Sequence, residues 1–376
     1  MREKVIIGLS GGVDSSVALI LLLEAGYDVE ACFMRNWDSA ANNDILGNPD
    51  SLKSICPQEN DYQDALAVAK KLNVKLHRVD FIKEYWEAVF VFFLEELKKG
   101  RTPNPDILCN KEIKFKAFLR YAEKLGFQKI AMGHYADIAE VNGKKYLAKA
   151  MDTNKDQTYF LSQLSSEQIN KALFPLGKLL KSEVREIALI YELITSKKKD
   201  STGICFIGER NFSKFLRNYL PAQKGLIKTL DGKVLGEHEG LMNYTIGQRK
   251  GIQIGGRNDA EKDAWYVLGK DLAENILYAG QGLDNEYLYA DSCTLEDINY
   301  LGEAFDGEKV LNGKFRYRAE EHQITIKFVK NEIEVRFLEL IRAVTPGQAC
   351  VFYQDNICLG GGTIKEVFRS GKKRMY

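Results

Sequence analysis

The chain has 376 residues, 45% of them hydrophobic and 28% charged, a composition typical of a globular protein with two or three domains. Its 53 basic and 52 acidic side chains nearly cancel, which excludes a histone-like partner but allows local nucleic-acid-binding patches. We find no apolar run of membrane-spanning length and no secretion signal, so we expect a cytoplasmic protein with no membrane partner. The seven cysteines are scattered, which argues against a secreted disulfide framework.

The first two hundred residues alternate between predicted strands and predicted helices. The strands are residues 4–9, 29–34, 74–80 and 129–134, and the helices are residues 14–25, 62–72, 83–99 and 110–125. This alternation predicts an α/β fold with a doubly wound, mostly parallel sheet. The polar segment 36–60 contains clusters of Asn, Asp and Pro, and we interpret it as a mobile loop.

After about residue 212 the pattern changes to that of β-hairpins. TLDGKVLG contains an Asp231-Gly232 turn, and FVKNEIEVRF and FYQDNICLGGG follow further along the chain. From about residue 285 apolar and polar residues alternate with period two, which predicts a small antiparallel β-barrel. We therefore expect an α/β domain of residues 1–208, a small central domain of residues 209–284 and a C-terminal barrel domain of residues 285–376.

The first predicted strand ends in SGGVDSS and passes directly into a helix. Glycines let the backbone approach an anion, and the free N–H groups of a helix start stabilise its charge. Neither GxxxxGK[ST] nor GxGxxG is present here, which excludes the two better-known phosphate loops. The hydroxyls and Asp14 suit a pyrophosphate with a magnesium ion. The alternative is a turn in which Ser10 or Asp14 caps the helix, but a capped turn needs fewer such residues.

Cys109 and Cys205 lie at junctions between loops and regular elements. Cys109 begins a predicted helix, where the helix dipole, Lys111 and Lys114 favour the thiolate. Cys205 follows Gly203 and precedes an apolar residue, so it can equally be a small buried side chain. For either cysteine taken alone, packing is the simpler explanation.

SGGVDSS resembles the signature of the PP-loop ATP pyrophosphatases, which split ATP between its α- and β-phosphates. Together with NPDILCN and DSTGICFIG, it makes the chain resemble the tRNA-specific 2-thiouridylases, which act on the wobble uridine of tRNA. The similarity extends over all three predicted regions, through the motifs FMRNW (33–37), MGHYA (132–136), NKDQTYFLSQL (154–164), YTIGQRKGI (244–252), FRYR (315–318) and TPGQACVFY (345–353).

The resemblance implies a sulfurtransferase that adenylates C2 of the wobble uridine, in the tRNAs for Lys, Glu and Gln, and then exchanges the oxygen for sulfur. The products would be 2-thiouridine, AMP and pyrophosphate. Cys205 would carry the persulfide and Cys109 would be the partner nucleophile, ending in a transient disulfide between them. Asp106 would be an acid or base, with helix capping as the alternative. ATP with Mg²⁺ would be required, and a cysteine desulfurase would supply sulfur directly or through a relay protein.

The resemblance also implies binding roles, with no dedicated metal site in the protein. The residues expected around ATP are Gly8, Leu9, Ser10, Gly11, Gly12, Val13, Asp14, Ser15, Met34 and Gly133. Those expected around the flipped target base are Asn104, Pro105 and Asp106. Those expected on the tRNA are His134, Lys155, Asp156, Gln157, Arg316, Tyr317 and Gln348. Without the resemblance, we would interpret His134 as a satisfied histidine at a strand end, and Arg316 and residues 155–157 as solvated surface.

Other PP-loop enzymes make lysidine, build arginine or guanine precursors, or thiolate tRNA with an iron–sulfur cluster. A cluster needs closely spaced cysteines, and no two here are closer than Cys350 and Cys358. The amidating enzymes need no paired thiols. A non-catalytic RNA-binding protein would be expected to have a degraded loop or to lack one of the two cysteines, and the sequence retains all three features.

Overall fold

The computed structural model describes residues 2–48, 57–200, 207, 210–254 and 263–375. The chain divides into two compact units. The first comprises Met1–Val91, Pro105–Phe215 and Gln354–Gly360, and the second comprises Phe92–Asn104, Leu216–Tyr353 and Gly361–Tyr376. Among the described residues, no helix has the length and apolar character that crossing a bilayer requires.

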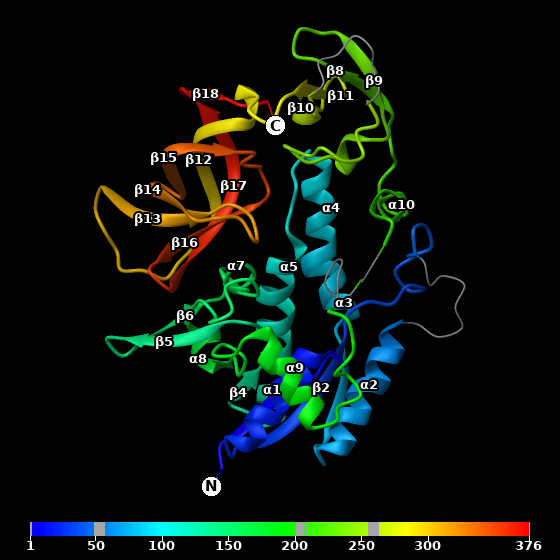
Figure 1. The fold of residues 1–376 in the computed structure, drawn as a ribbon, viewed down its shortest axis with the longest axis vertical. Helices are drawn as coiled ribbons and strands as arrows, with labels where there is room; N and C mark the ends of the chain where they lie inside the picture. The colour runs from blue at the N-terminus through cyan, green and yellow to red at the C-terminus, as the bar shows by residue number, and fades with distance from the viewer. Residues whose placement is uncertain (1, 49–56, 201–206, 208–209, 255–262, 376) are drawn as a thin grey trace. The chain divides into compact units, whose positions relative to one another are not determined.

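The first unit is built on a five-stranded sheet in the order β3-β2-β1-β4-β7, and every neighbouring pair is parallel (Figure 1). Its strands are β1 (Lys4–Gly8), β2 (Asp28–Arg35), β3 (Leu76–Asp80), β4 (Lys129–Ala131) and β7 (Ala172–Leu173). The predicted parallel sheet is confirmed, with the two-residue β7 as an unpredicted fifth strand. Chain order reverses at β1, since β2 lies on one side of it and β4 on the other.

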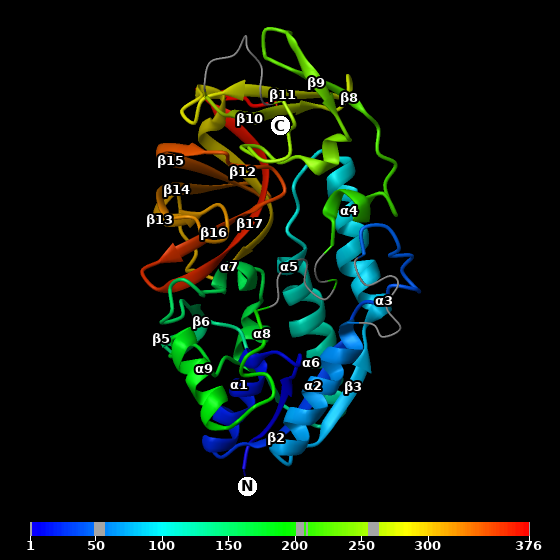
Figure 2. The same ribbon diagram turned by 45° about the vertical axis from the view of Figure 1, so that its right-hand side comes forward.

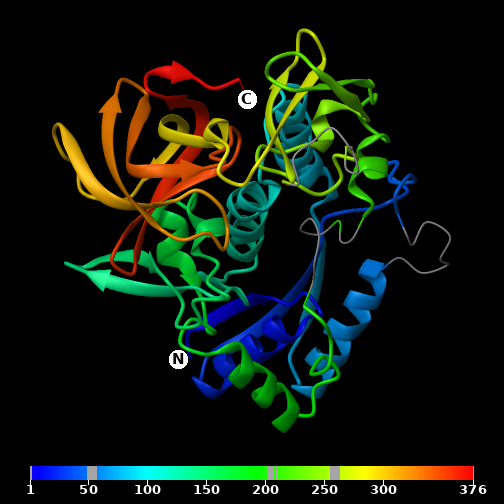
Figure 3. The ribbon, with the colours of Figure 1, turned by 45° about the horizontal axis from the view of Figure 1, so that its top comes forward.

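Alternate residues of the central strands form the main core of the first unit. Val5 and Ile7 of β1, with Val29 of β2, pack with three helices on one face of the sheet (Figure 3). These helices are α1 (Val13–Glu24), α2 (Pro57–Lys71) and α9 (Lys181–Ile190). Every second residue of these strands therefore packs on this face against helices that are far apart in sequence.

Two predicted helices contain π-helical stretches. Predicted helix 83–99 is found as α3 (Ile82–Tyr85), the π-helix η1 (Trp86–Phe90) and α4 (Val91–Lys98). Predicted helix 110–125 is found as α5 (Pro105–Leu108), the π-helix η2 (Cys109–Ala117) and α6 (Phe118–Lys124). The second helix thus begins at Pro105, whose ring favours the first helical position.

Residues 36–48 form a loop, as predicted, and it packs against the first unit through Trp37 and Asp44. Residues 57–60, which were predicted as part of the same loop, belong instead to α2. The Trp37 side chain is buried, and its Nε1–H donates to Asp44 Oδ2 at 3.1 Å. Asp44 also forms a 2.8 Å ion pair with Arg210, and both side chains are buried. The rings around Trp37 are those of Tyr85, Trp86, Phe90 and Phe215. A buried indole requires such a partner for its N–H group. Residues 49–56 lie outside the described part of the chain.

A hairpin that we did not predict follows β4. It consists of β5 (Asp137–Val141) and β6 (Lys144–Ala148), joined by Asn142 and Gly143, whose φ angles are 51° and 73°. Positive φ at both turn positions is the reason why Asn-Gly favours two-residue hairpins, and this dipeptide was the available sequence signal. Three short helices complete this part of the chain: α7 (Thr158–Leu161), α8 (Ser166–Lys171) and α10 (Phe212–Leu216).

The second unit contains a small mixed sheet in the order β10-β11-β8-β9. Its strands are β8 (Gly225–Lys228), β9 (Val234–His238), β10 (Trp265–Asp271) and β11 (Ile276–Gln281). The predicted hairpin at Asp231-Gly232 is confirmed, because β8 and β9 are antiparallel and Gly232 has a φ of 91°. The short 3₁₀ helices η3 (Leu241–Asn243) and η4 (Glu286–Leu288) follow β9 and β11.

The predicted antiparallel barrel is confirmed in the last part of the chain (Figure 2). Neighbouring strands follow the order β12-β15-β14-β13-β16-β17, and a further β12–β17 pairing closes the ring. The strands are β12 (Tyr289–Tyr300), β13 (Glu308–Lys314), β14 (His322–Val329), β15 (Glu332–Arg342), β16 (Ala349–Gln354) and β17 (Ile357–Arg369), with a short β18 (Lys372–Lys373) on β17. The two predicted hairpins in this region are the β14–β15 and β16–β17 turns.

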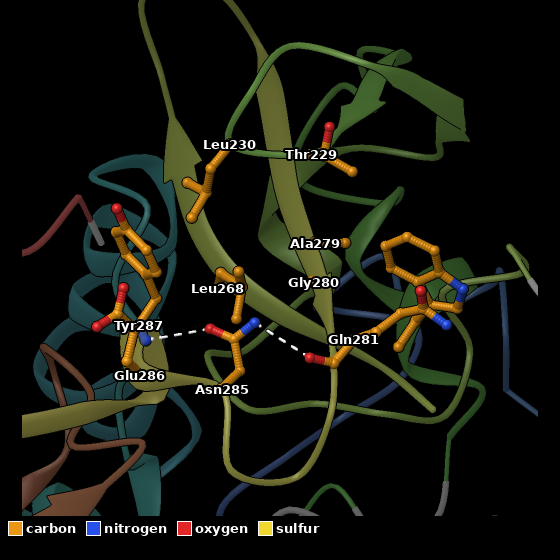
Figure 4. Close-up of a pocket in the computed structure, with 10 residues that line it drawn as sticks. Thr229, Leu230, Leu268, Ala279, Gly280, Gln281, Asn285, Glu286 and Tyr287 are labelled. Carbon is orange, nitrogen blue, oxygen red and sulfur yellow. Dashed lines mark hydrogen bonds between the residues drawn. The ribbon is translucent and has the colours of Figure 1, made fainter. Parts of the chain in front are cut away.

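A pocket of about 350 Å³ lies in the second unit, between the β8–β11 sheet and the start of the barrel (Figure 4). Leu230 and Leu268 line it with apolar surface. Asn285 is fixed at its edge, since its Nδ2 donates to Gln281 O and its Oδ1 accepts from Tyr287 N. Glu286 is the one charged residue among those that line it, so the pocket does not favour a polyanion.

Lys270 is a buried amine in the second unit, and its burial predicts how the free energy of unfolding changes with pH. Its Nζ donates to Gly100 O at 2.8 Å, and burial lowers its pKa to about 8. Because the unfolded chain holds this proton up to a higher pH, unfolding free energy should rise between pH 8 and the ordinary lysine pKa of 10.5. At pH 7 the buried ammonium costs roughly 3 kcal/mol.

We therefore expect Lys270→Met to raise the unfolding free energy at neutral pH and to remove this rise at alkaline pH. The measurement is a denaturant titration of both proteins across a pH series. Lys327→Met, at an exposed barrel position, is the matched control and should leave the pH dependence unchanged. A parallel pH dependence in wild type and Lys270→Met would show that Lys270 stays charged when folded.

Candidate functional site

The reversal of strand order at β1 predicts where a ligand binds in the first unit. In open α/β sheets, ligands bind beyond the carboxyl ends of the strands at the point where the order reverses. Here that point lies between β1 and β4. The chain leaving β1 forms residues 9–16, and the chain leaving β4 forms residues 132–135. SGGVDSS therefore lies where the topology alone would place a ligand.

The loop after β1 leaves the first backbone amides of α1 without a side-chain cap. The N-cap residue is Gly12, and no side chain bonds there. The alternative of a turn capped by Ser10 or Asp14 is therefore wrong. Ser15 Oγ instead accepts from Ser10 N at 3.1 Å, which tightens the loop. The first N–H groups of a helix have no intrahelical partner, so they are available to an anion.

Glycines permit close packing around this loop. Gly11 has a φ of 75°, and a Cβ there would collide with the Asp61 carbonyl oxygen on α2. A Cβ on Gly133 would lie 2.8 Å from the Ser15 nitrogen. A Cβ on Gly8 would lie 2.8 Å from Met132 Sδ and 3.0 Å from Met34 Cε. The structure thus brings Gly8, Met34 and Gly133 together with the loop.

Asp14 is held by two residues that are distant in sequence. Lys181 Nζ donates to Asp14 Oδ1 at 2.6 Å, and the Tyr135 hydroxyl donates to the same oxygen at 2.9 Å. Burial and the Asp14 carboxylate raise the pKa of Tyr135, which therefore stays a donor. Lys181 begins α9, which packs on α1. The SGGVDSS motif contains no lysine. Lys181 of α9 provides one beside the motif, and the sequence analysis did not identify it.

Asp200 gathers three basic side chains beside this pair. It accepts from Lys155 at 2.7 Å, Lys181 at 2.9 Å and Arg185 at 2.9 Å. Partial burial acts to raise the pKa of Asp200, but hydrogen bonds from the lysines outweigh it and lower the pKa to about 2. Lys155 is therefore engaged within the protein, next to the loop, and is not simply solvated.

Lys198 links the Gly11 end of the loop to α2. Its Nζ donates to Gly11 O at 3.0 Å, to Asp61 at 2.7 Å and to Asp64 at 2.6 Å. Burial acts to lower the pKa of Lys198, but the two carboxylates raise it above the ordinary value. Lys181 and Lys198 therefore both contact the loop, but each is paired with carboxylates, so an anionic ligand would compete with these ion pairs.

Cys109 is fully buried and lies one turn inside its helix. The prediction that Cys109 begins a helix is therefore wrong, and with it the argument from the dipole, because the helix starts at Pro105. Asp106 lies in that first turn, so a helix-start role is open to it. Cys205 lies outside the described residues.

His134 is buried between the rings of Phe115 and Phe174. Its Nε2 lies 3.3 Å from Lys114 Nζ. Burial, followed by the Lys114 charge, lowers the pKa of His134 well below its usual range, so the ring is neutral. Within the described residues, Nδ1 has no hydrogen-bond partner. The interpretation of His134 as a fully satisfied histidine is therefore wrong.

Asp156 and Gln157 are also tied into the first unit. Asp156 is buried and accepts from Ala150 N and Thr158 Oγ1, at 3.0 and 2.7 Å. Gln157 Oε1 accepts from Tyr135 N at 2.9 Å. The interpretation of this segment as an ordinary solvated face is wrong for Asp156, whose carboxylate organises the turn that precedes α7.

Arg316 and Gln348 make internal hydrogen bonds within the second unit. Arg316 Nη2 donates to Ile246 O, Ala343 O and Thr345 Oγ1, at 2.9 to 3.0 Å. Gln348 Nε2 donates to Thr102 O at 2.6 Å, two residues before Asn104. Arg316 is therefore not the solvated surface residue that we would expect without the family resemblance. Tyr317 is half-buried beside the guanidinium of Arg318.

Asp14, next to the loop, has one carboxylate oxygen that could contact a metal ion brought in by a ligand. Within the described ranges, no three His, Cys, Asp or Glu side chains form a metal-binding group. Both contacts of Asp14 are to Oδ1. Magnesium is usually bound by one or two carboxylates plus substrate phosphates, and Asp14 Oδ2 fits that mode.

These features define the class: an α/β protein of the PP-loop type, with a glycine-containing loop between the first strand and first helix of a parallel sheet. The chain is 56% identical over 377 residues to the tRNA-specific 2-thiouridylase MnmA of Acholeplasma laidlawii (strain PG-8A), covering 100% of both. It is 51% identical over 377 residues to that of Bacillus thuringiensis (strain Al Hakam), covering 100% of this chain and 98% of the relative. The chain belongs to the tRNA-specific 2-thiouridylase family.

Three domain families also match. Residues 3–209 match the family described as tRNA methyl transferase HUP domain, residues 213–281 match the tRNA methyl transferase PRC-barrel domain, and residues 290–364 match the aminomethyltransferase beta-barrel domain.

Solved structures give only distant similarity. NMN synthetase from Francisella tularensis matches with a TM-score of 0.33 and 19% identity, covering 53% of this chain and 67% of that chain. A 4-thiouridine synthetase–RNA complex with bound ATP matches with a TM-score of 0.33 and 16% identity, covering 57% of this chain and 50% of that chain. A likeness of this extent says nothing about function.

Proposed function

We propose that this protein is a tRNA-uridine 2-sulfurtransferase that uses ATP to convert the wobble uridine of tRNA to 2-thiouridine. The observation that carries the proposal is identity of 51% or more over the full chain to proteins named tRNA-specific 2-thiouridylase. The uncapped amides of the loop after β1 support the use of a pyrophosphate-containing substrate. We extend the substrate to the tRNAs for Lys, Glu and Gln on the resemblance noted above.

In the first step, uridine O2 attacks the α-phosphorus of ATP and pyrophosphate leaves. The amides of residues 11–15 would hold the pyrophosphate, and Lys181 would exchange its contact with Asp14 for the developing negative charge. A magnesium ion bound with ATP would neutralise further charge, and Asp14 would hold it. Adenylation turns a carbonyl oxygen, a very poor leaving group, into one that departs with AMP.

In the second step, the terminal sulfur of a persulfide on Cys205 attacks C2 and AMP leaves with the original oxygen. The Cys109 thiolate then attacks the inner sulfur of Cys205, which breaks the S–S bond and leaves sulfur on the uridine. A cytoplasmic thiol reductant would reduce the resulting disulfide. A cysteine desulfurase, acting directly or through a relay protein, would reload Cys205.

We also propose a division of labour along the chain: catalysis in residues 1–208, and tRNA binding shared with residues 209–284 and the barrel of residues 285–376. Asn104, Pro105 and Asp106 would surround the target base. Arg316 and Gln348 would contribute by fixing the backbone of residues that contact tRNA, since their own polar groups are bonded internally.

Methyl transfer is the second candidate, because two of the matching domain families are described as tRNA methyl transferase. A methyl transfer needs neither ATP cleavage nor a thiol pair. The test is nucleoside mass spectrometry of unmodified tRNA incubated with the protein, ATP, a desulfurase with cysteine, and S-adenosylmethionine as a methyl donor. We expect oxygen-to-sulfur exchange at the wobble uridine that depends on ATP. A methylated nucleoside, or no sulfur incorporation, would contradict the proposal.

A further inference from the structure

The helix that carries Cys109 contains the π-helix η2, and Cys109 is its first residue. In η2 the hydrogen bonds connect residues five apart, as Phe118 N to Ile113 O does. π-helical stretches are rare and are frequent at functional sites. Their wider turns have poorer backbone geometry than an α-helix, so such a stretch requires support from surrounding groups.

Gln168 of α8 supplies that support. Its Nε2 donates to Lys111 O at 3.1 Å and to Phe115 O at 3.0 Å, and both carbonyls belong to η2. Its Oε1 accepts from Ser165 N at 2.8 Å, as part of the capping box of α8. One side-chain amide therefore joins the start of α8 to two consecutive turns of η2. No function assigned above uses Gln168.

Two further hydrogen bonds connect η2 to the segment from α7 to α8. Asn110, which is buried next to Cys109, donates from Nδ2 to Phe160 O at 3.1 Å. Lys111 Nζ lies 3.4 Å from Gln163 Oε1. The segment from α7 to α8 thus contacts η2 at its first residues and again one turn later. This arrangement fixes both the position and the register of η2.

Register decides where the Cys109 thiol points. A change from five-residue to four-residue spacing alters the angle between successive side chains, so Cys109 would turn relative to the residues that follow it. We propose that Gln168 is a positioning residue for Cys109, acting through the two η2 carbonyls. The inference rests on the proposed function, in which Cys109 breaks the persulfide bond.

The sharpest test is Gln168→Glu. Glutamate keeps an oxygen that can accept from Ser165 N, but it cannot donate to Lys111 O or Phe115 O. We expect thiolation turnover to fall about 100-fold, as for a small misplacement of a reacting group, while KM for tRNA and the rate of pyrophosphate release stay unchanged. Gln168→Met, which is neutral and of similar length, should give the same result if the charge of Glu prevents folding.

Ser165→Ala is the matched control, because it weakens the same capping box and leaves the Gln168 amide in place. It should leave thiolation within about twofold, since an N-cap contributes only about 1 kcal/mol to helix stability. If Ser165→Ala lowers thiolation as much as Gln168→Glu, or if pyrophosphate release falls with thiolation in Gln168→Met, Gln168 supports the fold only and the proposal is overturned.

A second measurement separates this inference from the proposed function. Hydrogen–deuterium exchange with mass spectrometry follows the backbone amides of residues 109–117, without ATP or tRNA, because the Cys109 thiol itself is buried. We expect faster exchange of these amides in both Gln168 variants and wild-type exchange in Ser165→Ala. Identical exchange in all four proteins would overturn the positioning role. A wild-type protein that fails to thiolate tRNA would overturn the proposed function and would leave this readout intact.

Discussion

Replacing Cys109 by serine is expected to abolish thiolation while adenylation of tRNA continues. A hydroxyl cannot attack a persulfide in thiol–disulfide exchange, and loss of a covalent nucleophile typically costs a factor of about 10,000 or more in turnover. The measurement is a single-turnover reaction of Cys109→Ser with ATP, tRNA and a sulfur donor. Pyrophosphate release should proceed, and 2-thiouridine should be undetectable.

Cys32→Ala is the control for loss of a buried thiol. Cys32 is fully buried in β2, and burial raises its pKa to about 12, so it stays protonated and unreactive at neutral pH. We expect this variant to thiolate tRNA at close to the wild-type rate. Thiolation by Cys109→Ser, or loss of its pyrophosphate release, would remove Cys109 from the role proposed for it.

Replacing Asp14 by asparagine should lower pyrophosphate formation by about 1,000-fold, the upper range for loss of one charge-stabilising group at a reaction centre. Asparagine keeps an oxygen for the Tyr135 hydroxyl but loses the charge that holds Lys181 and would bind magnesium. Because Asp14 is not a helix cap, the melting temperature should change little.

Asp64→Asn serves as the matched control, since Asp64 pairs with Lys198 on the α2 side of the loop. It should retain most of the pyrophosphate formation. An Asp14→Asn protein that unfolds at much lower temperature, yet forms pyrophosphate at the wild-type rate once folded, would assign Asp14 a structural role only.

The parallel strands, the barrel and the turn that joins β1 to α1 could be predicted from sequence because each depends on local pattern. Buried strands show continuous apolar residues, barrel strands alternate, and SGGVDSS joins a strand to a helix. The start of the Cys109 helix was missed although Pro105 marks the first helical position. The packing of residues 36–48 was missed because their composition is polar, although Trp37 is buried with Asp44.

The rest of the site depends on contacts between residues far apart in sequence. Lys181 reaches Asp14 only because α9 packs on α1, and no spacing rule connects the two. The hydrogen bonds from Gln168 of α8 to two carbonyls of η2 are likewise not visible in the sequence of η2. Such contacts follow from the tertiary fold and cannot be read from periodicity.

The most direct test of the proposed reaction follows the oxygen that sulfur replaces. A substrate tRNA is prepared with oxygen-18 at C2 of the wobble uridine and is incubated with the protein, ATP and a sulfur donor. If uridine O2 attacks the α-phosphorus of ATP, each 2-thiouridine formed yields one AMP that carries the label, together with unlabelled pyrophosphate. Unlabelled AMP with the label in water, or ADP as the nucleotide product of thiolation, would contradict adenylation at the loop after β1.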